Sequence, residues 1–371
     1  MLRRILTGLA APVLAIGLAF GITCLILLAT HDSPSAFFDV LTQEPKPRNI
    51  INILNNASVL YLSALAAAIG FRMNLFNIGV EGQYQMAVFG AAVLAGSAWI
   101  PGPFSVVICI LLAMLVGAIW AAIPAILKVT RGVSEVISTI MLNAIAVSIT
   151  GFLLRKWGEE TGSNLATKTI PGDSRVPGIQ LVSDAPNKLL GLSLIAVVAG
   201  IGYVVLLNYT RFGFALRATG RSASAAAASG IDVRRMTVYS MLISGAVAGL
   251  IGLPLLFGDS YSYGTTFQSG IGFAGIAVAL LGRNSAIGMA FGAVLFTALD
   301  EQSSKLEINA QISAHIVEVS KGVIVLSVVI AYEVVRRYLA SAEQRRVAAQ
   351  LADERRSAPP PDATPVLEAS R

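Results

Sequence analysis

The sequence predicts an all-α membrane protein with about ten transmembrane helices. Of its 371 residues, 55% are hydrophobic and only 13% are charged, whereas soluble domains carry about 25% charged residues. The apolar residues also gather in long runs, most of which can cross a hydrocarbon core of about 30 Å at 1.5 Å rise per residue. Composition and run length together therefore predict a polytopic helical fold.

Ten apolar runs follow one another along the chain. They cover about residues 9–30, 51–71, 75–98, 104–127, 134–154, 189–208, 236–257, 269–282, 286–299 and 312–335. The first run is longer than the apolar core of a signal peptide, so we expect a retained anchor. Residues 1–335 are predicted to form the membrane domain. Residues 336–371 are predicted to form a charged tail, helical to Arg356 and disordered through its proline-rich end.

Lysine and arginine positions predict a multi-pass protein of the plasma membrane with both termini in the cytoplasm. In that orientation most of the 27 basic residues face inward, and the short loops agree best with the positive-inside rule. The net charge of +6 is therefore explained by the basic residues that set the orientation of the chain in the membrane. Membrane lipid is an expected partner, and nucleic acid is not. Cys24 and Cys109 lie in apolar runs and suggest neither a metal site nor a disulfide.

A polar segment, Phe76 to Gln83, opens the third run. The apolar stretch after it, residues 86–100, is too short to span the membrane alone, so the polar residues have to lie within it or at its edge. Polar groups at that depth cost free energy unless they face a cavity or another part of the protein. We predict that this segment lines a solute pathway, with these candidate residues: Asn74, Asn77, Glu81 and Gln83.

The spacing of three candidates adds detail. Asn74, Asn77 and Glu81 are spaced i, i+3 and i+7, so on a continuous helix they would share one face. Amides donate and accept hydrogen bonds without charge, which suits a neutral solute. For Glu81, three roles stay open: a solute contact, a packing partner of a buried amide, or a proton carrier.

Two parts of the chain, about 51–154 and 236–335, are predicted to run in opposite directions across the membrane. Such inverted halves place solute pathways near their symmetry axis, often at broken helices. The third run contains Phe76-Asn-Ile-Gly-Val80 and the eighth contains Phe267-Gln-Ser-Gly-Ile271, which share a Phe-polar-x-Gly-β-branched pattern. Phe267 and Gln268 therefore join the pathway candidates, together with Asn143, an isolated polar residue in the fifth run.

Several other motifs have ordinary explanations. The glycines of residues 270–275 fit a dinucleotide fingerprint, but they open a membrane run, where glycine permits close helix packing. No Walker A pattern occurs, so the chain itself is not expected to bind ATP by that route. His315 has no companions at metal-ligand spacing. Asp300 and Glu301 end the ninth run, where we expect solvation at the outer surface.

The cytoplasmic loop 209–235 is rich in alanine and basic residues. Its composition predicts a short helix over about 222–229, with Ser222 as the N-cap and Gly230 as the stop. A helix of such small residues fits into the groove of another protein, whereas a surface connector would more often carry bulky anchors. The loop is therefore a candidate docking element.

This loop resembles the coupling loop of permease subunits of bacterial ABC importers, in the branch that serves ribose-type sugars, branched-chain amino acids and nucleosides. The residues that match, and would contact the ATPase subunit, are Arg217, Gly220, Ala225, Ala226, Gly230 and Ile231. Residues 71–83, 132–143 and 275–284 are similar to the purine nucleoside branch. Four positions depart from the family pattern: Ser222, Ser224, Ala274 and Ala286.

The resemblance implies a permease subunit that is not itself an enzyme and binds no cofactor, since ATP would be bound by a partner ATPase. It also implies a second, paralogous permease, in a heterodimer or a homodimer, and an extracytoplasmic solute-binding lipoprotein. The expected solute is a nucleoside, and a sugar such as ribose is the alternative within the class. A gradient-driven secondary transporter is a second alternative, although such a carrier has no need for a docking loop. A membrane-embedded hydrolase is a third alternative, but the sequence contains no nucleophile and base at a convincing spacing.

Overall fold

The computed structural model describes residues 2–100, 102–161 and 164–357, with a helix at each of the ten predicted runs. These are α1 (Leu2–Ala29), α3 (Pro47–Phe71), α4 (Val80–Gly96), α5 (Pro103–Arg131), α6 (Glu135–Trp157), α7 (Leu194–Tyr209), α10 (Val233–Ala248), α12 (Ile271–Leu281), α13 (Ala286–Ala310) and α14 (His315–Ser357). Seven helical segments of the described chain are long and apolar enough to cross a membrane. The predicted helical membrane fold is confirmed.

Shorter elements lie in the connections and at the end of the seventh run. They are α2 (Pro34–Leu41), α8 (Arg211–Arg221), α9 (Ala223–Ala228), α11 (Leu253–Leu255), the 3₁₀ helices η1 (Gly172–Ser174) and η2 (Gly191–Ser193), the π-helix η3 (Leu256–Ser260), and strands β1 (Glu159–Thr161) and β2 (Asn164–Ala166). The two strands form a small antiparallel hairpin. The backbone N–H of Thr167 donates to the carbonyl of Tyr263 at 2.8 Å, so the long loop after α6 folds back onto the membrane domain.

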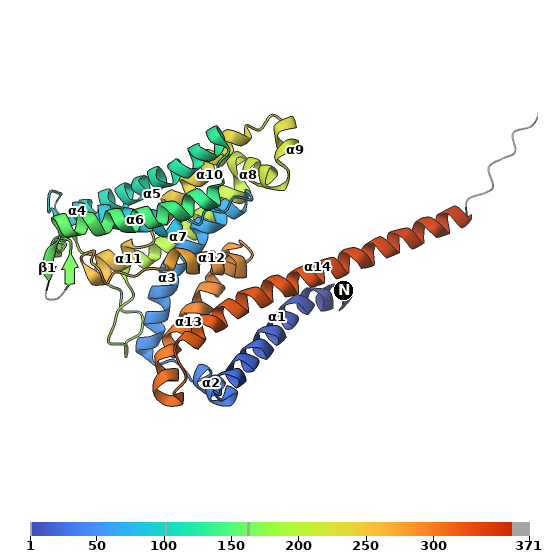
Figure 1. Ribbon diagram of the computed structural model, residues 1–371, viewed down its shortest axis with the longest axis horizontal. Helices are drawn as coiled ribbons and strands as arrows, with labels where there is room; N and C mark the ends of the chain where they lie inside the picture. The colour runs from blue at the N-terminus through green and yellow to red at the C-terminus, as the bar shows by residue number, and fades with distance from the viewer. Residues whose placement is uncertain (1, 101, 162–163, 358–371) are drawn as a thin grey trace, which may run out of the picture.

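The helices form two groups joined by α3 (Figure 1). Helices α4, α5, α6 and α10 lie together, and α1, α2, α13 and α14 form the other group. Helix α3 contacts α10, α12 and α13, and residues 62–70 are fully buried. The short α9, the N-terminus and the far end of α14 lie at one end of the molecule, and β1 lies at the other. Helix α9 and the far end of α14 therefore lie on the same side of the molecule, and the cytoplasmic orientation of both termini stays a prediction.

Small residues allow α5 and α10 to approach closely. A Cβ atom added at Gly117 would meet the carbonyl of Gly245, and one added at Gly245 would meet Gly117 and Ala121. Membrane helices gain stability from such close backbone contact because the surrounding lipid is as apolar as their own side chains. These glycines therefore bring α10 close to α5, which packs against α4.

The third run is not one continuous helix, so the expected shared face of Asn74, Asn77 and Glu81 is wrong. Helix α3 ends at Phe71 and α4 begins at Val80, with a turn in between. Asn74 adopts a left-handed φ of 59°, a conformation that asparagine tolerates better than most residues. The turn directs Asn74 to the surface and Asn77 into the interior.

The two copies of the Phe-polar-x-Gly pattern occupy equivalent places in their helices. Helix α4 starts directly after its N-cap Gly79, and α12 starts directly after its N-cap Gly270. Each pattern thus marks the point where irregular backbone turns into a short helix. The N-terminal part of the tail is helical as predicted, because α14 continues to Ser357. The proline-rich part predicted to be disordered lies outside the described residues.

Substitution of Gly245 by leucine tests the close approach of α5 and α10. Overpacking a tight contact costs about 1–3 kcal/mol, and more where backbone blocks the new side chain. We expect a lower melting temperature in detergent, measured by size-exclusion chromatography after heating. The matched control is Gly202→Leu on α7, where an added Cβ meets nothing within 4 Å; equal losses for the two variants would contradict the assignment.

Candidate functional site

The start of α4 contributes to a buried cluster of polar side chains, here called the polar node: Asn77, Glu81, Gln83, Asn143 and Ser244. Asn77 donates to Oε1 of Gln83 at 3.0 Å and to the hydroxyl of Ser244 on α10 at 2.8 Å. Gln83 donates back to Oδ1 of Asn77 at 2.9 Å. Asn77 and Gln83 are 0% and 1% exposed, so this reciprocal pair satisfies amides that no solvent reaches.

Glu81 connects α4 to α12. Its carboxylate accepts from the backbone N–H groups of Gly270 at 2.8 Å and Gly272 at 2.7 Å, and from Nε2 of Gln85 at 2.8 Å. The carboxylate thus lies at the N-terminus of α12, where unpaired N–H groups favour negative charge. Gly272 is required there, because a Cβ would collide with the backbone of Glu81.

Asn143 fixes the turn before α4 from the side of α6. Its Oδ1 accepts from the N–H of Gly82 at 2.9 Å, and its Nδ2 donates to the carbonyl of Ile78 at 2.9 Å. One amide therefore satisfies a donor and an acceptor that the break in the helix leaves unpaired. Asn143 is 6% exposed, so its role in this structure is to brace the turn.

The structure brings four pathway candidates together and separates the other three. Asn77, Glu81, Gln83 and Asn143 form the polar node with Ser244, which sequence inspection missed because serine is common in membrane helices. Asn74 is exposed in the turn after α3. The ring of Phe267 lies against that of Tyr263 in a tilted arrangement, with centroids 5.1 Å apart. Gln268 is exposed and lines a cavity. Solute contact stays a prediction for all seven residues.

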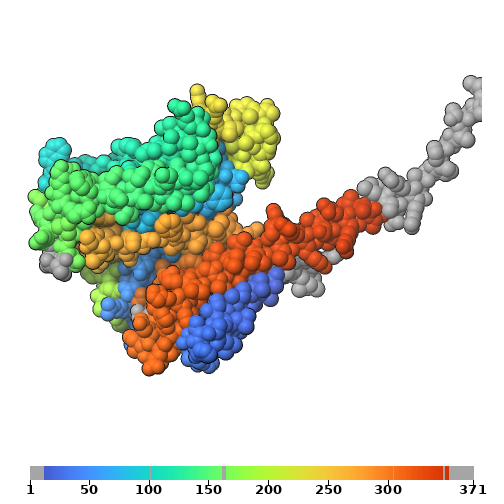
Figure 2. All heavy atoms as spheres, viewed as in Figure 1, coloured from blue at the N-terminus to red at the C-terminus, as the bar shows by residue number. Residues whose placement is uncertain are grey.

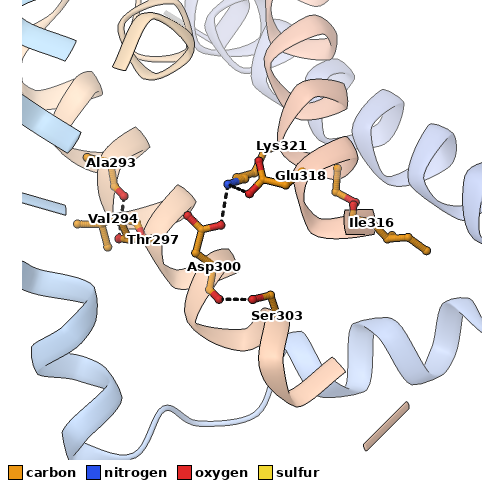
Figure 3. A network of polar contacts seen from close by, with 9 residues as sticks. Ala293, Val294, Thr297, Asp300, Ser303, Ile316, Glu318 and Lys321 are labelled. Carbon is orange, nitrogen blue, oxygen red and sulfur yellow. Dashed lines mark hydrogen bonds and ion pairs between the residues drawn. The ribbon is translucent and has the colours of Figure 1, made fainter. Parts of the chain in front are cut away.

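That cavity has a volume of about 460 Å³ and lies between α3, α12, α13 and α14. Its polar lining includes Asn56, Gln268, Asp300, Glu318 and Lys321. Lys321 donates to Asp300 at 2.6 Å and to Glu318 at 2.8 Å, and Figure 3 shows its Nζ between the two carboxylates. Asp300 is exposed, as expected, but it is also paired with a cation at a cavity wall, which the sequence did not predict.

Lys321 was not among the residues predicted from the sequence, although its position in an apolar run is unusual for a charged residue. It lies in the tenth apolar run, three residues after Glu318, and charged residues within membrane segments are rare and usually paired. Its side chain is only 10% exposed. A search for isolated charges within the apolar runs would have found it.

The docking loop folds as predicted, with one addition. Helix α9 begins after Ser222, whose hydroxyl accepts from the N–H of Ala225 at 3.3 Å, and ends before Gly230 at a left-handed φ of 85°. Ala226 is buried against the permease, whereas Ala225 is exposed. The addition is α8, which precedes α9 and places it at the end of the molecule (Figure 1).

Contacts of α8 link the docking loop to the turn between α3 and α4. Gly220 lies so close to the backbone of Arg72 and Met73 that no Cβ fits. Arg72 donates to the carbonyl of Asn284, between α12 and α13, at 2.6 Å. Arg217 donates to the carbonyl of Leu207 and to Asn208 at the end of α7. Residues 72–79 thus connect α8 with the polar node.

Comparisons with known proteins identify a family and several relatives. The model of the family described as branched-chain amino acid transport system / permease component matches residues 49–332. The chain is 32% identical to the guanosine ABC transporter permease protein NupP of Bacillus subtilis, over 90% of this chain and 96% of that protein. It is 31% identical to the nucleoside ABC transporter permease protein NupB of Lactococcus lactis, over 86% and 90%. It is 28% identical to the glucose ABC transporter permease protein TsgB13 of Haloferax volcanii, over 88% of each.

Substitution of Glu81 by glutamine tests the link between α4 and α12. The amide cannot accept with both of its polar atoms, and a hydrogen bond to a charged group is worth about 1.5–3 kcal/mol. We expect a lower melting temperature in detergent and faster proteolysis of the 258–270 loop. Glu307→Gln on α13, an exposed carboxylate, is the control; an unchanged melting temperature for Glu81→Gln would contradict the link.

Proposed function

The chain belongs to the branched-chain amino acid transport system / permease component family, and from this membership we propose that it imports nucleosides as the membrane subunit of an ABC importer. The observation that supports this solute class most strongly is the similarity to two permeases named for guanosine and nucleosides, at 32% and 31% identity over most of the chain. The fold of the polar node and the docking loop is compatible with this role.

The importer would include partners that supply energy and solute. An ATPase subunit would bind ATP and contact α9, whose exposed alanines leave room for a groove on the partner. A second permease, paralogous to this one or a second copy of it, would complete the membrane part. An extracytoplasmic lipoprotein would deliver the solute at the end of the molecule where β1 lies (Figure 1).

Motion would pass from α9 to the pathway through contacts already described. ATP binding by the partner would shift α8 and α9, and Gly220 would transmit the shift to Arg72 because their backbones touch. Arg72 also holds the carbonyl of Asn284, so the turns at the ends of α3 and α12 would move together. The polar node lies at the other end of residues 72–79, so its residues would move with this turn.

The geometry does not favour a proton-driven carrier that uses Glu81. Two backbone N–H groups and one side-chain amide already donate to the carboxylate, and Glu81 is only 4% exposed, so the carboxylate is engaged in contacts between helices and is not open to water. A sugar stays the second candidate solute, because one relative is named for glucose. Guanosine, other ribonucleosides and glucose share neighbouring hydroxyl groups, so both candidates present the same chemistry to the permease.

Reconstitution tests the solute. We expect the permease, assembled in proteoliposomes with its ATPase, second permease and binding lipoprotein, to accumulate radiolabelled guanosine or uridine only when ATP is supplied. Free ribose and glucose are the comparison solutes. Accumulation of glucose without any accumulation of nucleosides would contradict the proposal.

Substitution of Ala225 by tryptophan tests the docking face of α9. The residue is exposed, so the permease should fold and assemble normally while the bulky ring blocks a small-residue interface. We expect ATP-driven uptake to fall at least about tenfold, equivalent to about 1.4 kcal/mol of coupling. Ala340→Trp, at an exposed alanine of the projecting α14, is the control, and undiminished uptake by the Ala225 variant would exclude this face from docking.

A further inference from the structure

We infer that the cavity between α3, α12, α13 and α14 binds the neighbouring hydroxyl groups of a neutral sugar-containing solute through Asp300 and Glu318. This inference rests on the proposed nucleoside transport and names the part of the solute that the permease contacts. A cavity of about 460 Å³ lies within the range of small-molecule sites in proteins, about 300–1,000 Å³.

The two carboxylates are held in place by one buried cation. Lys321 is 10% exposed, whereas Asp300 and Glu318 are 46% and 67% exposed. Nζ of Lys321 engages Oδ1 of Asp300 and Oε1 of Glu318. Within the described chain the second oxygen of each carboxylate accepts no hydrogen bond. Each can therefore accept from a solute hydroxyl, and a charged acceptor makes the stronger bond.

The charges select a class of solute. Lys321 occupies the position between the carboxylates that a metal ion would take, so a cation gains little there (Figure 3). The two carboxylates outnumber the one ammonium, so the cavity wall carries excess negative charge and repels phosphates and other anions. Asn56 and Gln268, both exposed at the same cavity, supply amides that pair with neutral polar groups. A neutral solute rich in hydroxyls fits all of these features.

The position of the cavity agrees with this role. Ser269 and Gly270 also line it, and the N–H of Gly270 donates to Glu81 in the polar node. A solute bound at Asp300 therefore lies next to the N-terminus of α12, at one of the two helix breaks. A solute in the cavity would therefore lie against Gly270, which takes part in the contact that joins α4 to α12.

Protection of an introduced cysteine tests the site without depending on transport. In a permease with Cys24 and Cys109 replaced by serine, Ser269→Cys places a small thiol on the cavity wall. Maleimide labelling of that thiol is measured in the assembled complex with increasing uridine, ribose or 2′,3′-dideoxyuridine. We expect uridine and ribose to slow labelling at concentrations about tenfold lower than the dideoxy compound requires.

The variants Asp300→Asn and Glu318→Gln complete the test. Each keeps its shape and leaves Lys321 one charged partner, so folding should be retained, and each should remove most of the preference for uridine. Glu301→Gln, whose carboxylate accepts from Asn52 at 3.0 Å instead of lining the cavity, should keep it. Equal protection by the three compounds, no protection, or an unchanged preference in both variants would overturn the inference.

Uptake by the same complexes separates this inference from the proposed function. Diol-dependent protection without nucleoside uptake would support the site and refute nucleoside transport. Nucleoside uptake without diol-dependent protection would refute the site and support the transport.

Discussion

The structure depends on one hydrogen-bonded contact between α4 and α12: the carboxylate of Glu81 accepts from the backbone N–H groups of Gly270 and Gly272. A helix that begins inside a membrane domain exposes N–H groups that lipid cannot satisfy. Here the first turn of α4 supplies the acceptor that the first turn of α12 lacks. The start of α12 is thereby tolerated because of Glu81 on α4, whereas Asn143 on α6 satisfies the N–H of Gly82 at the start of α4.

Small residues make this contact possible. Gly272 and Gly275 let α12 approach α4 and α3 closely, and Ser63 donates to the carbonyl of Ile271 at 2.9 Å. Asn77 extends the hydrogen-bonded cluster to Ser244 on α10, and Ser244 in turn donates to the carbonyl of Ala66 on α3 at 2.6 Å. Because nearly every buried polar atom here has a partner, a change at one residue would leave others unpaired.

Much of the fold follows from the sequence, because lipid imposes a simple rule on segment length and polarity. The ten apolar runs, the helix over 222–229 and the stop at Gly230 depend on local chemistry and were predicted. The end of the second run at residue 71 was predicted, but the start of α4 at Val80 instead of residue 75 was not. The turn at Asn74 competes with helix only through tertiary contacts such as Asn143 with Ile78. The pairing of Lys321 with Asp300 joins two separate helices, which no spacing within one helix specifies. For the same reason the sequence identified Glu81 as unusual but not as a cap for α12.

Helix α14 runs unbroken from His315 to Ser357, a length of about 65 Å at 1.5 Å per residue. The hydrocarbon core is about 30 Å thick, so roughly half of the helix extends beyond one such thickness, and Figure 2 shows α14 projecting away from the other helices. Glu333 pairs with Arg336 and Arg337 where the projection begins. Because α14 is long, a tilt of a few degrees near Lys321 would displace its far end by several ångströms. A spectroscopic label attached to the part of α14 that lies in water would therefore detect rearrangements that occur deep within the bilayer.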